Sequence, residues 1–316
     1  MSTIHVLSPG LLTTVQDLGR EGFGSMGVSA SGAADPLALR IGNRLVANAE
    51  NAAALEMTLV GGTFLFPEGA VIALTGSNFG ATLDGVPAPL WTWQSVNPGQ
   101  TLRFESAVSG ARCYLCVQGG IAVPLFLGSA STHILSGLGG FEGRPLRKAD
   151  VLNIGPADRS FRRRSVAPDA LQRLSPRKAL RVTPGPQDKW FSESEFRKLL
   201  SAEYSVSEES NRMGLRLKGP ALTLAEGRLN GDMITEGVSL GAIQIPEGGL
   251  PIILFVEQQT TGGYPKVASV IAADLPSVGQ LRPRDRIQFE RVSWDMARSV
   301  LQDHENILAS IDFIVE

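Results

Sequence analysis

Short apolar runs separated by glycine- and proline-rich breaks make up most of the chain. Runs of four to eight apolar residues, many of them β-branched, between turn signals predict strands. In the first half we expect such strands at residues 4–7, 63–66, 71–75, 81–86, 101–105, 111–118 and 150–154. In the second half we expect them at 214–217, 242–245, 252–256, 267–271 and 286–289.

Helix signals are few. Asp35 followed by Pro36 predicts an N-cap and a first helical turn. Ser192 with Glu195 forms a capping box, and Ser293 caps a last helix near the end of the chain. The pattern therefore predicts a mainly β protein with a few helices.

Several short motifs recur in the same order in the two halves. They are Pro-Gly at 9–10 and 184–185, Met-Gly at 26–27 and 213–214, Pro-Glu-Gly at 67–69 and 246–248, and a proline before a strand at 98 and 283. We interpret them as two related β-rich halves, each a barrel or curled sheet with a helix or two, at residues 1–156 and 181–316. Residues 157–180 form the linker between them, and the local basic run there is better explained by solvation than by nucleic-acid binding.

Composition indicates the partners and the cellular compartment of the protein. A formal net charge of −2 over 316 residues does not indicate a nucleic-acid partner. The first ten residues lack the basic and apolar regions of a signal peptide, and no apolar stretch approaches the ~20 residues needed to cross a membrane. Two cysteines are typical of a reducing compartment. We therefore expect a cytoplasmic protein with no membrane partner.

The richest candidate for chemistry is the segment from Thr260 to Lys266, which follows one apolar run and precedes another. It offers two hydroxyls, the peptide N–H groups of Gly262 and Gly263, the phenol of Tyr264 and an ammonium group. Such donors at the end of a strand suit an anionic oxygen, since glycines let a ligand approach the backbone. The alternative is an ordinary hairpin connection, because Gly-Gly and Tyr-Pro are also turn sequences.

A second candidate is the polar, glycine-rich segment from Thr13 to Gly32, which we expect to be a long functional loop. Two interpretations of Asp17 and Arg20 within it stay open. They form a surface ion pair that contributes little to stability, or they position a polar substrate.

Other motifs are weak. The G-x-G-x-x-G string at 22–27 lacks the preceding strand and the helix that a dinucleotide site requires. Cys113 and Cys116 lie three residues apart on a predicted strand, so their thiols should point to opposite faces and cannot hold one metal. His133 lacks the partners of a serine–histidine hydrolase, and the chain contains no P-loop. We expect no metal site and no cofactor bound by this chain.

Long stretches of the chain resemble one known family, the biotin-dependent carboxyltransferase/allophanate hydrolase subunit 2 family. The resemblance covers nearly the whole chain and rests on TTVQDLGREGFGSMGVSASGAAD, NRLVANAENAAALEMTL, RCYLCVQGGIAVPLFLGSAST, GGFEGRPL, NRMGLRLKGP and GAIQIPEGGLPIILFVEQQTTGGYPKVASVIAADLPSVGQLRP. It implies a fold of two related cyclophilin-like β-barrel halves and a smaller B subunit as an obligate partner.

The resemblance also implies an activity, the ATP-dependent opening of 5-oxo-L-proline to L-glutamate. In that interpretation a kinase-like A subunit uses the ATP, and the B subunit and this chain bind the small anionic lactam and complete ring opening. The implied catalytic residues are Lys266, Tyr264 and Gln244, and the implied substrate-binding residues are Gln16, Asp17, Arg20, Asn78, Arg212, Thr261, Gly262 and Gly263. We assign Lys266 and the two glycine peptides to the anion, Tyr264 to proton donation and Arg20 to a carboxylate clamp.

One difference from the family's sequence pattern affects the expected substrate site. The family's Gly-Ser-Arg-Ser-Thr reads Gly-Ser-Ala-Ser-Thr here, so Ala130 replaces a cation. Two alternatives stay open. The chain could transfer a carboxyl group from carboxybiotin carried elsewhere, since it has no Met-Lys-Met biotinylation site, as in urea or amide carboxylases. It could also be a non-catalytic regulator that sequesters a kinase inhibitor.

Overall fold

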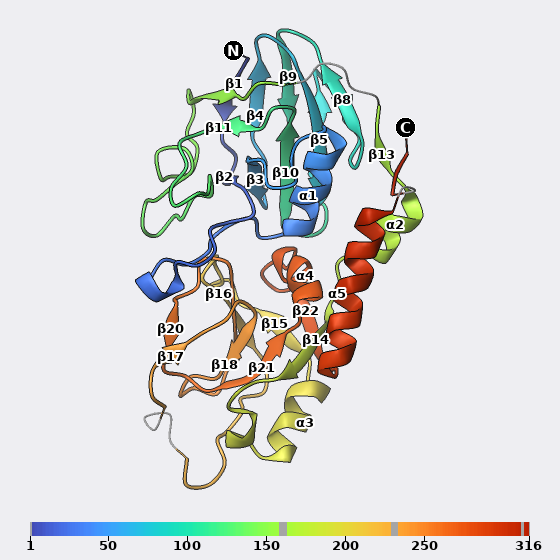
Figure 1. Ribbon diagram of the computed structural model, residues 1–316. Helices are drawn as coiled ribbons and strands as arrows, with labels where there is room; N and C mark the ends of the chain where they lie inside the picture. The colour runs from blue at the N-terminus through green and yellow to red at the C-terminus, as the bar shows by residue number, and fades with distance from the viewer. Residues whose placement is uncertain (1, 158–162, 229–232, 311–312, 316) are drawn as a thin grey trace. The chain divides into compact units, whose positions relative to one another are not determined.

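The computed structural model describes residues 2–157, 163–228, 233–310 and 313–315. The chain forms two compact units. Unit 1 contains Met1–Arg20, Ser31–Leu174 and Ile307–Glu316, and unit 2 contains Glu21–Ala30 and Ser175–Asn306. Strands far outnumber helices in the described residues (Figure 1), which confirms the predicted mainly β fold with a few helices.

Unit 1 contains two antiparallel sheets. One has the strand order β11-β12-β1-β4-β9-β6-β7 and the other the order β2-β3-β10-β5-β8. Their strands are β1 (Thr3–Ser8), β2 (Leu12–Gln16), β3 (Ala54–Thr58), β4 (Thr63–Phe66), β5 (Ala70–Gly76), β6 (Thr82–Leu83), β7 (Val86–Pro87), β8 (Trp93–Val96), β9 (Gln100–Arg103), β10 (Arg112–Val117), β11 (Ile121–Ala122) and β12 (Val151–Ile154). A small pair joins β13 (Ser165–Val166) to β23 (Ile314–Val315), and α2 (Pro168–Arg173) follows β13.

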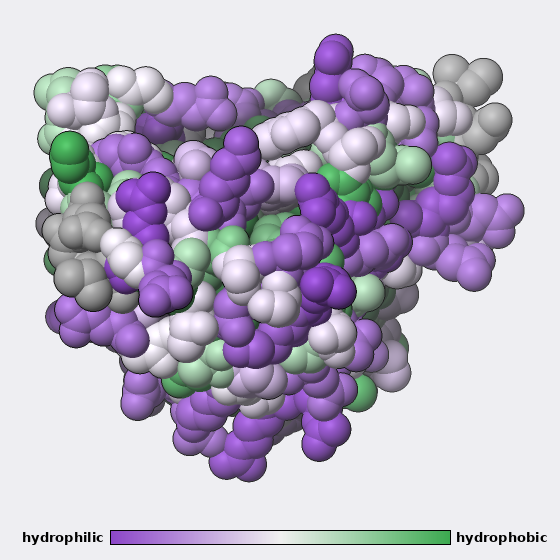
Figure 2. Space-filling view, turned by 90° about the horizontal axis from the view of Figure 1, so that it is seen from below, coloured by the Kyte–Doolittle hydropathy of each residue, from purple (hydrophilic) through white to green (hydrophobic). Residues whose placement is uncertain are grey.

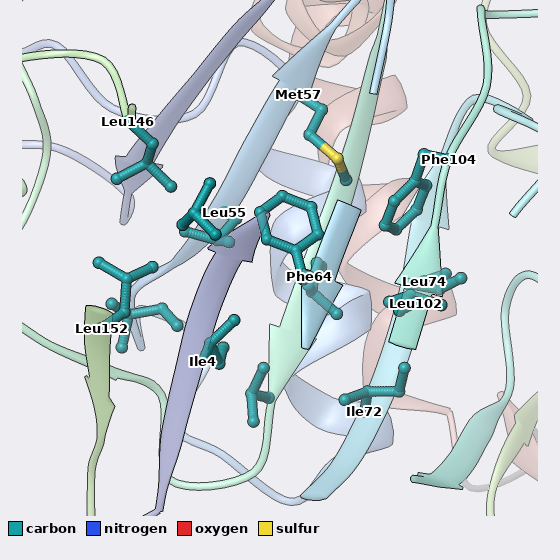
Figure 3. Close-up of a cluster of buried hydrophobic side chains, with 14 of the residues drawn as sticks. Ile4, Leu55, Met57, Phe64, Ile72, Leu74, Leu102, Phe104, Leu146 and Leu152 are labelled. Carbon is teal, nitrogen blue, oxygen red and sulfur yellow. The ribbon is translucent and has the colours of Figure 1, made fainter. Parts of the chain in front are cut away.

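The core of unit 1 lies between the two sheets. Side chains from both meet there (Figure 3), among them Ile4, Phe64 and Leu152 from the first sheet and Leu55 and Leu74 from the second. The other face of the second sheet is covered by α1 (Pro36–Leu45), which buries Leu39 and Ile41 against it. Unit 1 is therefore layered as sheet, sheet and helix, with alternate residues of each strand facing different layers.

That alternation confirms the prediction for the cysteines. Cys113 points into the core between the sheets, and Cys116 points toward α1. Burial raises the pKa of both thiols, so the reactive thiolate form is disfavoured. The pair is structural.

Unit 2 is built on a closed barrel with the strand order β14-β21-β18-β19-β16-β15-β22. Its strands are β14 (Ala179–Pro184), β15 (Tyr204–Val206), β16 (Gly214–Lys218), β18 (Ala242–Gln244), β19 (Ile252–Leu254), β21 (Lys266–Val270) and β22 (Arg286–Arg291). A separate two-stranded arm pairs β17 (Glu236–Gly237) with β20 (Thr261–Gly262). The barrel confirms the predicted barrel architecture.

Alternating side chains fill the barrel. Leu215, Leu217, Ile243, Ile253 and Ala268 are all buried, and they occupy the inward positions of four neighbouring strands. The barrel interior is a packed core, so ligand chemistry in unit 2 belongs to the outside of the barrel or to its ends.

The predicted helix starts are confirmed. Asp35 accepts a hydrogen bond from the backbone N–H of Ala38 and begins α1. Ser192 accepts one from Glu195 and begins α3 (Glu193–Ser201), which packs on β22. Ser293 precedes α5 (Trp294–Ala309). The remaining helical elements of the described residues are α4 (Leu275–Gly279) and the short 3-10 helices η1 (Gly24–Met26), η2 (Asp188–Trp190) and η4 (Ala272–Asp274).

One strand prediction and one loop prediction need correction. Residues 81–86 form a tight hairpin of β6 and β7 rather than one strand, because Asp84 and Gly85 both have positive φ and reverse the chain. Residues 13–16 of the predicted functional loop belong to β2, where Gln16 is paired with Ala54 of β3.

The repeated motifs fall mostly on turns. Pro-Gly follows β1 in unit 1 and lies at the end of β14 in unit 2. The Met-Gly pair instead lies in and after η1 at residues 26–27 and at the start of β16 at 213–214. Strand order also differs, since β1 pairs directly with β4 whereas β21 separates β14 from β18. The division into residues 1–156, a 157–180 linker and 181–316 stays a prediction, and residues 158–162 of that linker lie outside the described residues.

The surface visible in Figure 2 is mainly hydrophilic, and hydrophobic residues appear on it as small separate areas. No helix among the described residues has the length and apolar character that crossing a membrane requires.

Packing between the sheets of unit 1 is testable at Phe64. Its ring is fully buried and makes an edge-to-face contact with Phe104, with centroids 6.1 Å apart. We expect Phe64→Ala to lower the free energy of unfolding by about 3–5 kcal/mol through cavity formation. Leu125→Ala, at a site 67% exposed, should change it by less than about 0.5 kcal/mol. Urea denaturation measures both, and equal effects would show that the core is not where the structure places it.

Candidate functional site

The polar candidates of unit 1 are organised around Asp17. Its Oδ1 accepts hydrogen bonds from Gly19 N at 2.7 Å, Ser129 Oγ at 2.6 Å and Ser131 Oγ at 2.5 Å. Its Oδ2 accepts one from Ala130 N at 2.6 Å. The side chain is only 7% exposed. Asp17 therefore ties the end of β2 to the loop at residues 129–131, and its carboxylate is already surrounded by donors.

Arg20 joins the same cluster. The residue is 2% exposed, its guanidinium donates to the carbonyl oxygens of Phe126 and Ser131, and it lies over the Phe126 ring. The surface ion-pair interpretation of Asp17 and Arg20 is therefore wrong, because both residues are buried. Through these contacts Arg20 holds the 126–131 loop, and its predicted role as a clamp on a substrate carboxylate stays a prediction.

Gln16 and Asn78 lie at opposite ends of the second sheet. Gln16 is fully buried and its Nε2 donates to Thr14 Oγ1 and to the carbonyl of Thr132. Asn78 is exposed, follows β5, and accepts a hydrogen bond from Gly80 N at 2.8 Å. Strand register places the end of β5 level with Thr13, at the other end of β2 from Gln16. Asn78 is thus not part of the cluster around Asp17.

The 260–266 segment of unit 2 is not a hairpin connection. β18 lies between β19 and β21 in the barrel, so the chain that joins the latter two must pass over β18. On the way it forms β20, which pairs with β17. The hairpin interpretation is wrong because it needs the two flanking strands to be neighbours.

Lys266 is buried in an ion pair. Its side chain is 3% exposed, and Nζ lies 2.6 Å from Glu236 Oε1. Gln187 Nε2 donates to the same oxygen at 2.9 Å, and Gln187 Oε1 accepts from Lys266 N at 3.1 Å. The hydrogen bond from Lys266, followed by that from Gln187, lowers the pKa of Glu236. The positive charge of Lys266 is therefore balanced by a carboxylate, and its proposed contact with a ligand anion stays a prediction.

Gln244 and Tyr264 share a pocket of about 200 Å³. Gln244 is 2% exposed, whereas Tyr264 is 41% exposed. Of the neighbouring candidates, Thr261 is exposed and Gly262 is buried. Two of the three predicted catalytic side chains thus line one pocket, and the third, Lys266, is paired with Gln244 across β18 and β21.

Arg212 lies elsewhere. It is 5% exposed and forms a buried ion pair with Glu257, which is 2% exposed. Glu257 N also donates to the Arg212 carbonyl at 2.8 Å. This pair joins the start of β16 to the residues after β19. The arginine that lines the pocket is Arg216.

Sequence reasoning missed several residues at these sites. Glu236 and Gln187 complete the surroundings of Lys266, and Asn211, Arg216 and Gln259 line the pocket. Arg216 alternates with two leucines in β16, so its outward direction was readable from the sequence. Glu236 carried no such signal, because only the pairing of the β17–β20 arm brings it to Lys266.

Other candidate chemistry finds little support. His133 is 8% exposed, and its Nδ1 accepts a hydrogen bond from Ser136 N at 3.2 Å. In the described part of the chain, no group of three or more His, Cys, Asp or Glu residues could hold a metal ion.

Comparison with known proteins identifies the class. The family described as "Carboxyltransferase domain, subdomain A and B" matches residues 26–291. The chain belongs to this family, as its resemblance predicted.

Individual members of the family are similar to the chain over most of its length. The chain is 38% identical to the C subunit of 5-oxoprolinase from Escherichia coli, over 96% of this chain and 95% of the relative. It is 37% identical to the C subunit of the Haemophilus influenzae 5-oxoprolinase, over 99% of both. The crystal structure of the K. lactis urea amidolyase superposes with a TM-score of 0.90 at 32% identity, over 99% of this chain but 21% of that one. Two relatives matched end to end are thus named as subunits of an enzyme.

The cluster at Asp17 generates one prediction. Asp17→Asn preserves shape but places an amide N–H₂ among donors, so at least one buried group loses its acceptor. We expect the free energy of unfolding to fall by about 1.5–3 kcal/mol. Asp84→Asn, at an exposed turn with positive φ that asparagine tolerates, is the control and should change it little. An unchanged stability for Asp17→Asn in urea denaturation would contradict the central place given to this carboxylate.

A second prediction concerns Glu236. Glu236→Gln removes the anion that faces the buried ammonium of Lys266. Because Glu236 itself is 45% exposed, solvent screens the pair, and the free energy of unfolding should fall by only about 1 kcal/mol near neutral pH. Because the folded-state pKa of Glu236 is lowered, the stabilisation is complete above the ordinary value of 4.5 and disappears as the pH falls through the lowered value. Wild type and variant should therefore converge in acid.

The matched control is Glu208→Gln, which removes a largely exposed partner of Arg284 in the same unit. It should change stability by less than about 1 kcal/mol. Thermal unfolding across a pH series measures all three proteins. A Glu236→Gln effect that does not depend on pH would rule out the ion pair as its source.

Proposed function

We propose that this chain is the C subunit of an ATP-dependent 5-oxoprolinase. The observation that carries the proposal is the end-to-end match with two relatives of that name, over 95% and 99% of their lengths. A shared domain within a larger enzyme would match only part of such relatives. The urea amidolyase chain, of which 21% is covered, is related in that partial way.

In the proposed complex this chain acts with a B subunit and a kinase-like A subunit in the cytoplasm. A five-membered lactam is a poor electrophile, so its ring opening needs an activating step. The chain contains no P-loop, and we assign ATP to the A subunit and no cofactor to this chain.

The chemistry of ring opening sets what the site must do. Water adds to the lactam carbonyl carbon, negative charge develops on the carbonyl oxygen, the C–N bond breaks, and the nitrogen takes a proton. Donors aimed at the developing charge lower the barrier to such reactions. We assign proton donation to Tyr264, and its position in the same pocket as the buried Gln244 supports that assignment.

Lys266 has a less direct role in this proposal. Its ammonium and Glu236 together carry no net charge, so the pair orients the chain next to β20 and supplies a polarised N–H group. The peptides of Gly262 and Gly263 lie in or beside β20 and remain the backbone donors of the proposal. Arg20 positions the 126–131 loop of unit 1 rather than clamping the substrate.

Carboxyl transfer from carboxybiotin is the second candidate function. The TM-score of 0.90 to urea amidolyase and the name of the matched family favour it. The biotin would come from a carrier on another chain, because this sequence has no Met-Lys-Met site.

Reconstitution distinguishes the two functions. The chain is co-purified with its B subunit, the A subunit is added, and L-glutamate released from 5-oxo-L-proline is measured with and without ATP. We expect ATP-dependent release by the complete mixture and none without this chain. No release, together with ATP-dependent carboxylation of urea in the presence of a biotin carboxylase and its carrier, would overturn the proposal in favour of carboxyl transfer.

Substitution at Lys266 tests the site within that assay. We expect Lys266→Ala to lower kcat/KM by about 10²-fold or more, the scale seen when one catalytic donor is lost. Lys266→Met preserves the apolar stem of the side chain, so it separates the effect of losing the charge from the effect of losing packing. Lys218→Ala, at an exposed position of the same unit, is the control. A full ATP-dependent rate in folded Lys266→Ala would exclude this residue from the reaction.

A further inference from the structure

The pocket shared by Gln244 and Tyr264 lies on the outer face of the unit 2 barrel. Register pairs Arg216 with Ile252 and Ile252 with Gln244 across β16, β19 and β18. Directly paired residues project to the same face of a sheet. The alternate residues, including Ile243 and Ile253, fill the barrel. Arg216, Ile252 and Gln244 thus form one outward row that makes up the wall of the pocket.

Gln244 faces outward and is nevertheless 2% exposed. The chain that crosses β18 covers it, because Gly262 lies directly over its amide. The Nε2 group has no hydrogen-bond partner among the described residues. A buried amide without a partner destabilises a protein by about 1–3 kcal/mol, so the group needs an explanation, and a bound ligand is one. The orphaned amide lies in the wall of a pocket, where a ligand could accept its hydrogen bond.

Gly262 brings a second amide to the same place. A Cβ at this residue would lie 2.5 Å from Gln244 Nε2 and 2.9 Å from Gln259 Nε2. The two amides therefore converge on one point beside the backbone. A side chain at residue 262 would push both apart, which explains the glycine without invoking positive φ.

The polar lining of the pocket is rich in donors. Besides the two glutamines it includes Asn211, Arg216 and Tyr264, and no Asp or Glu is among the described residues that line it. Asn211 Oδ1 accepts a hydrogen bond from Met213 N at 2.8 Å, so the amide N–H₂ is the donor that this side chain can offer. One cation and several neutral donors, without a carboxylate, suit an anionic oxygen ligand.

The apolar lining and the size limit the ligand further. Met213, Pro246, Ile252 and Leu254 line the remainder. A volume of about 200 Å³ corresponds to about seven waters at ~30 Å³ each. The pocket therefore accommodates a small acid with a short apolar body rather than a nucleotide or a peptide.

We propose that this pocket is a binding site for a small carboxylate, with Gln244 Nε2 as the central donor, Gln259 as the second and Arg216 as the cation at the rim. The inference rests on the proposed function, since 5-oxo-L-proline and L-glutamate both carry such a carboxylate. It places substrate recognition in unit 2 and assigns to these residues the clamping role first expected of Arg20.

The test compares two probes that differ only in the carboxylate. 5-oxo-L-proline and 2-pyrrolidinone are titrated into the complex of this chain with its B subunit, and dissociation constants are measured by calorimetry or ligand-observed NMR. We expect 5-oxo-L-proline to bind at least tenfold more tightly. Equal affinities would overturn the carboxylate assignment.

Three variants locate the site. Gln244→Glu has nearly the same shape but replaces the donor by an anion, and should weaken 5-oxo-L-proline binding at least tenfold. Arg216→Gln alters an exposed side chain and should weaken 5-oxo-L-proline binding about fivefold or more. Gln288→Glu adds the same charge at an exposed position of β22 and should change affinity less than twofold. Unchanged binding in folded Gln244→Glu and in Arg216→Gln would overturn the proposal.

The outcome separates this inference from the proposed function. If the reconstituted enzyme releases glutamate and its KM for 5-oxo-L-proline is unchanged in Gln244→Glu, the pocket inference fails and the function stands. If carboxylate binding depends on Gln244 and Arg216 but no glutamate is released, the pocket stands and the function fails.

Discussion

The position of β18 between β19 and β21 is the constraint on which the functional part of unit 2 depends. Because β19 and β21 are not adjacent in the barrel, the chain that joins them must pass over the outer face of β18. Its passage buries Gln244 and brings Gly262 against that amide. A hairpin at the same residues would have left β18 open to solvent and made no pocket.

Three buried cations hold segments of the chain in place. Lys266 is paired with Glu236, Arg212 with Glu257, and Arg20 donates to backbone carbonyls. Buried cations need such partners, because an unpaired charge in a low dielectric is strongly destabilising. The pocket is faced by neutral amides and by Arg216 at its rim. The amides can bind an anion or a carbonyl without the desolvation penalty of a buried charge.

Unit 1 uses buried polar groups in the same way. Glu56 Oε2 accepts from Tyr114 Oη at 2.7 Å and from Ala34 N at 2.8 Å, and Tyr114 Oη accepts from Asp35 N at 2.8 Å. Burial and the nearby Glu56 carboxylate raise the pKa of Tyr114, so the phenol stays protonated and can make the first of these bonds. This network fixes the start of α1, as Asp17 fixes the 129–131 loop. Together they give the glycine-rich segments a defined conformation that their composition alone does not supply.

What the sequence determined by itself was local. Helix caps at Asp35, Ser192 and Ser293, the alternation that sends Cys113 and Cys116 to opposite faces, and most strand positions follow from residues within a few places of one another. The Asp-Gly turn at 84–85 was equally local and was overlooked. The family was also recognisable from the sequence, because long matching motifs can be compared without knowing which residues are in contact.

Tertiary structure alone decided which polar residues meet. Asp17 forms a hydrogen bond with Ser129, which lies 112 residues away in the sequence. Glu236 forms an ion pair with Lys266 only because β17 pairs with β20. The barrel order that buries Gln244 depends on pairings among strands that no local pattern specifies. The physical reason is that a hydrogen bond or an ion pair depends on distance in space, whereas the periodicity of a sequence reports only which face of its own strand or helix each residue occupies.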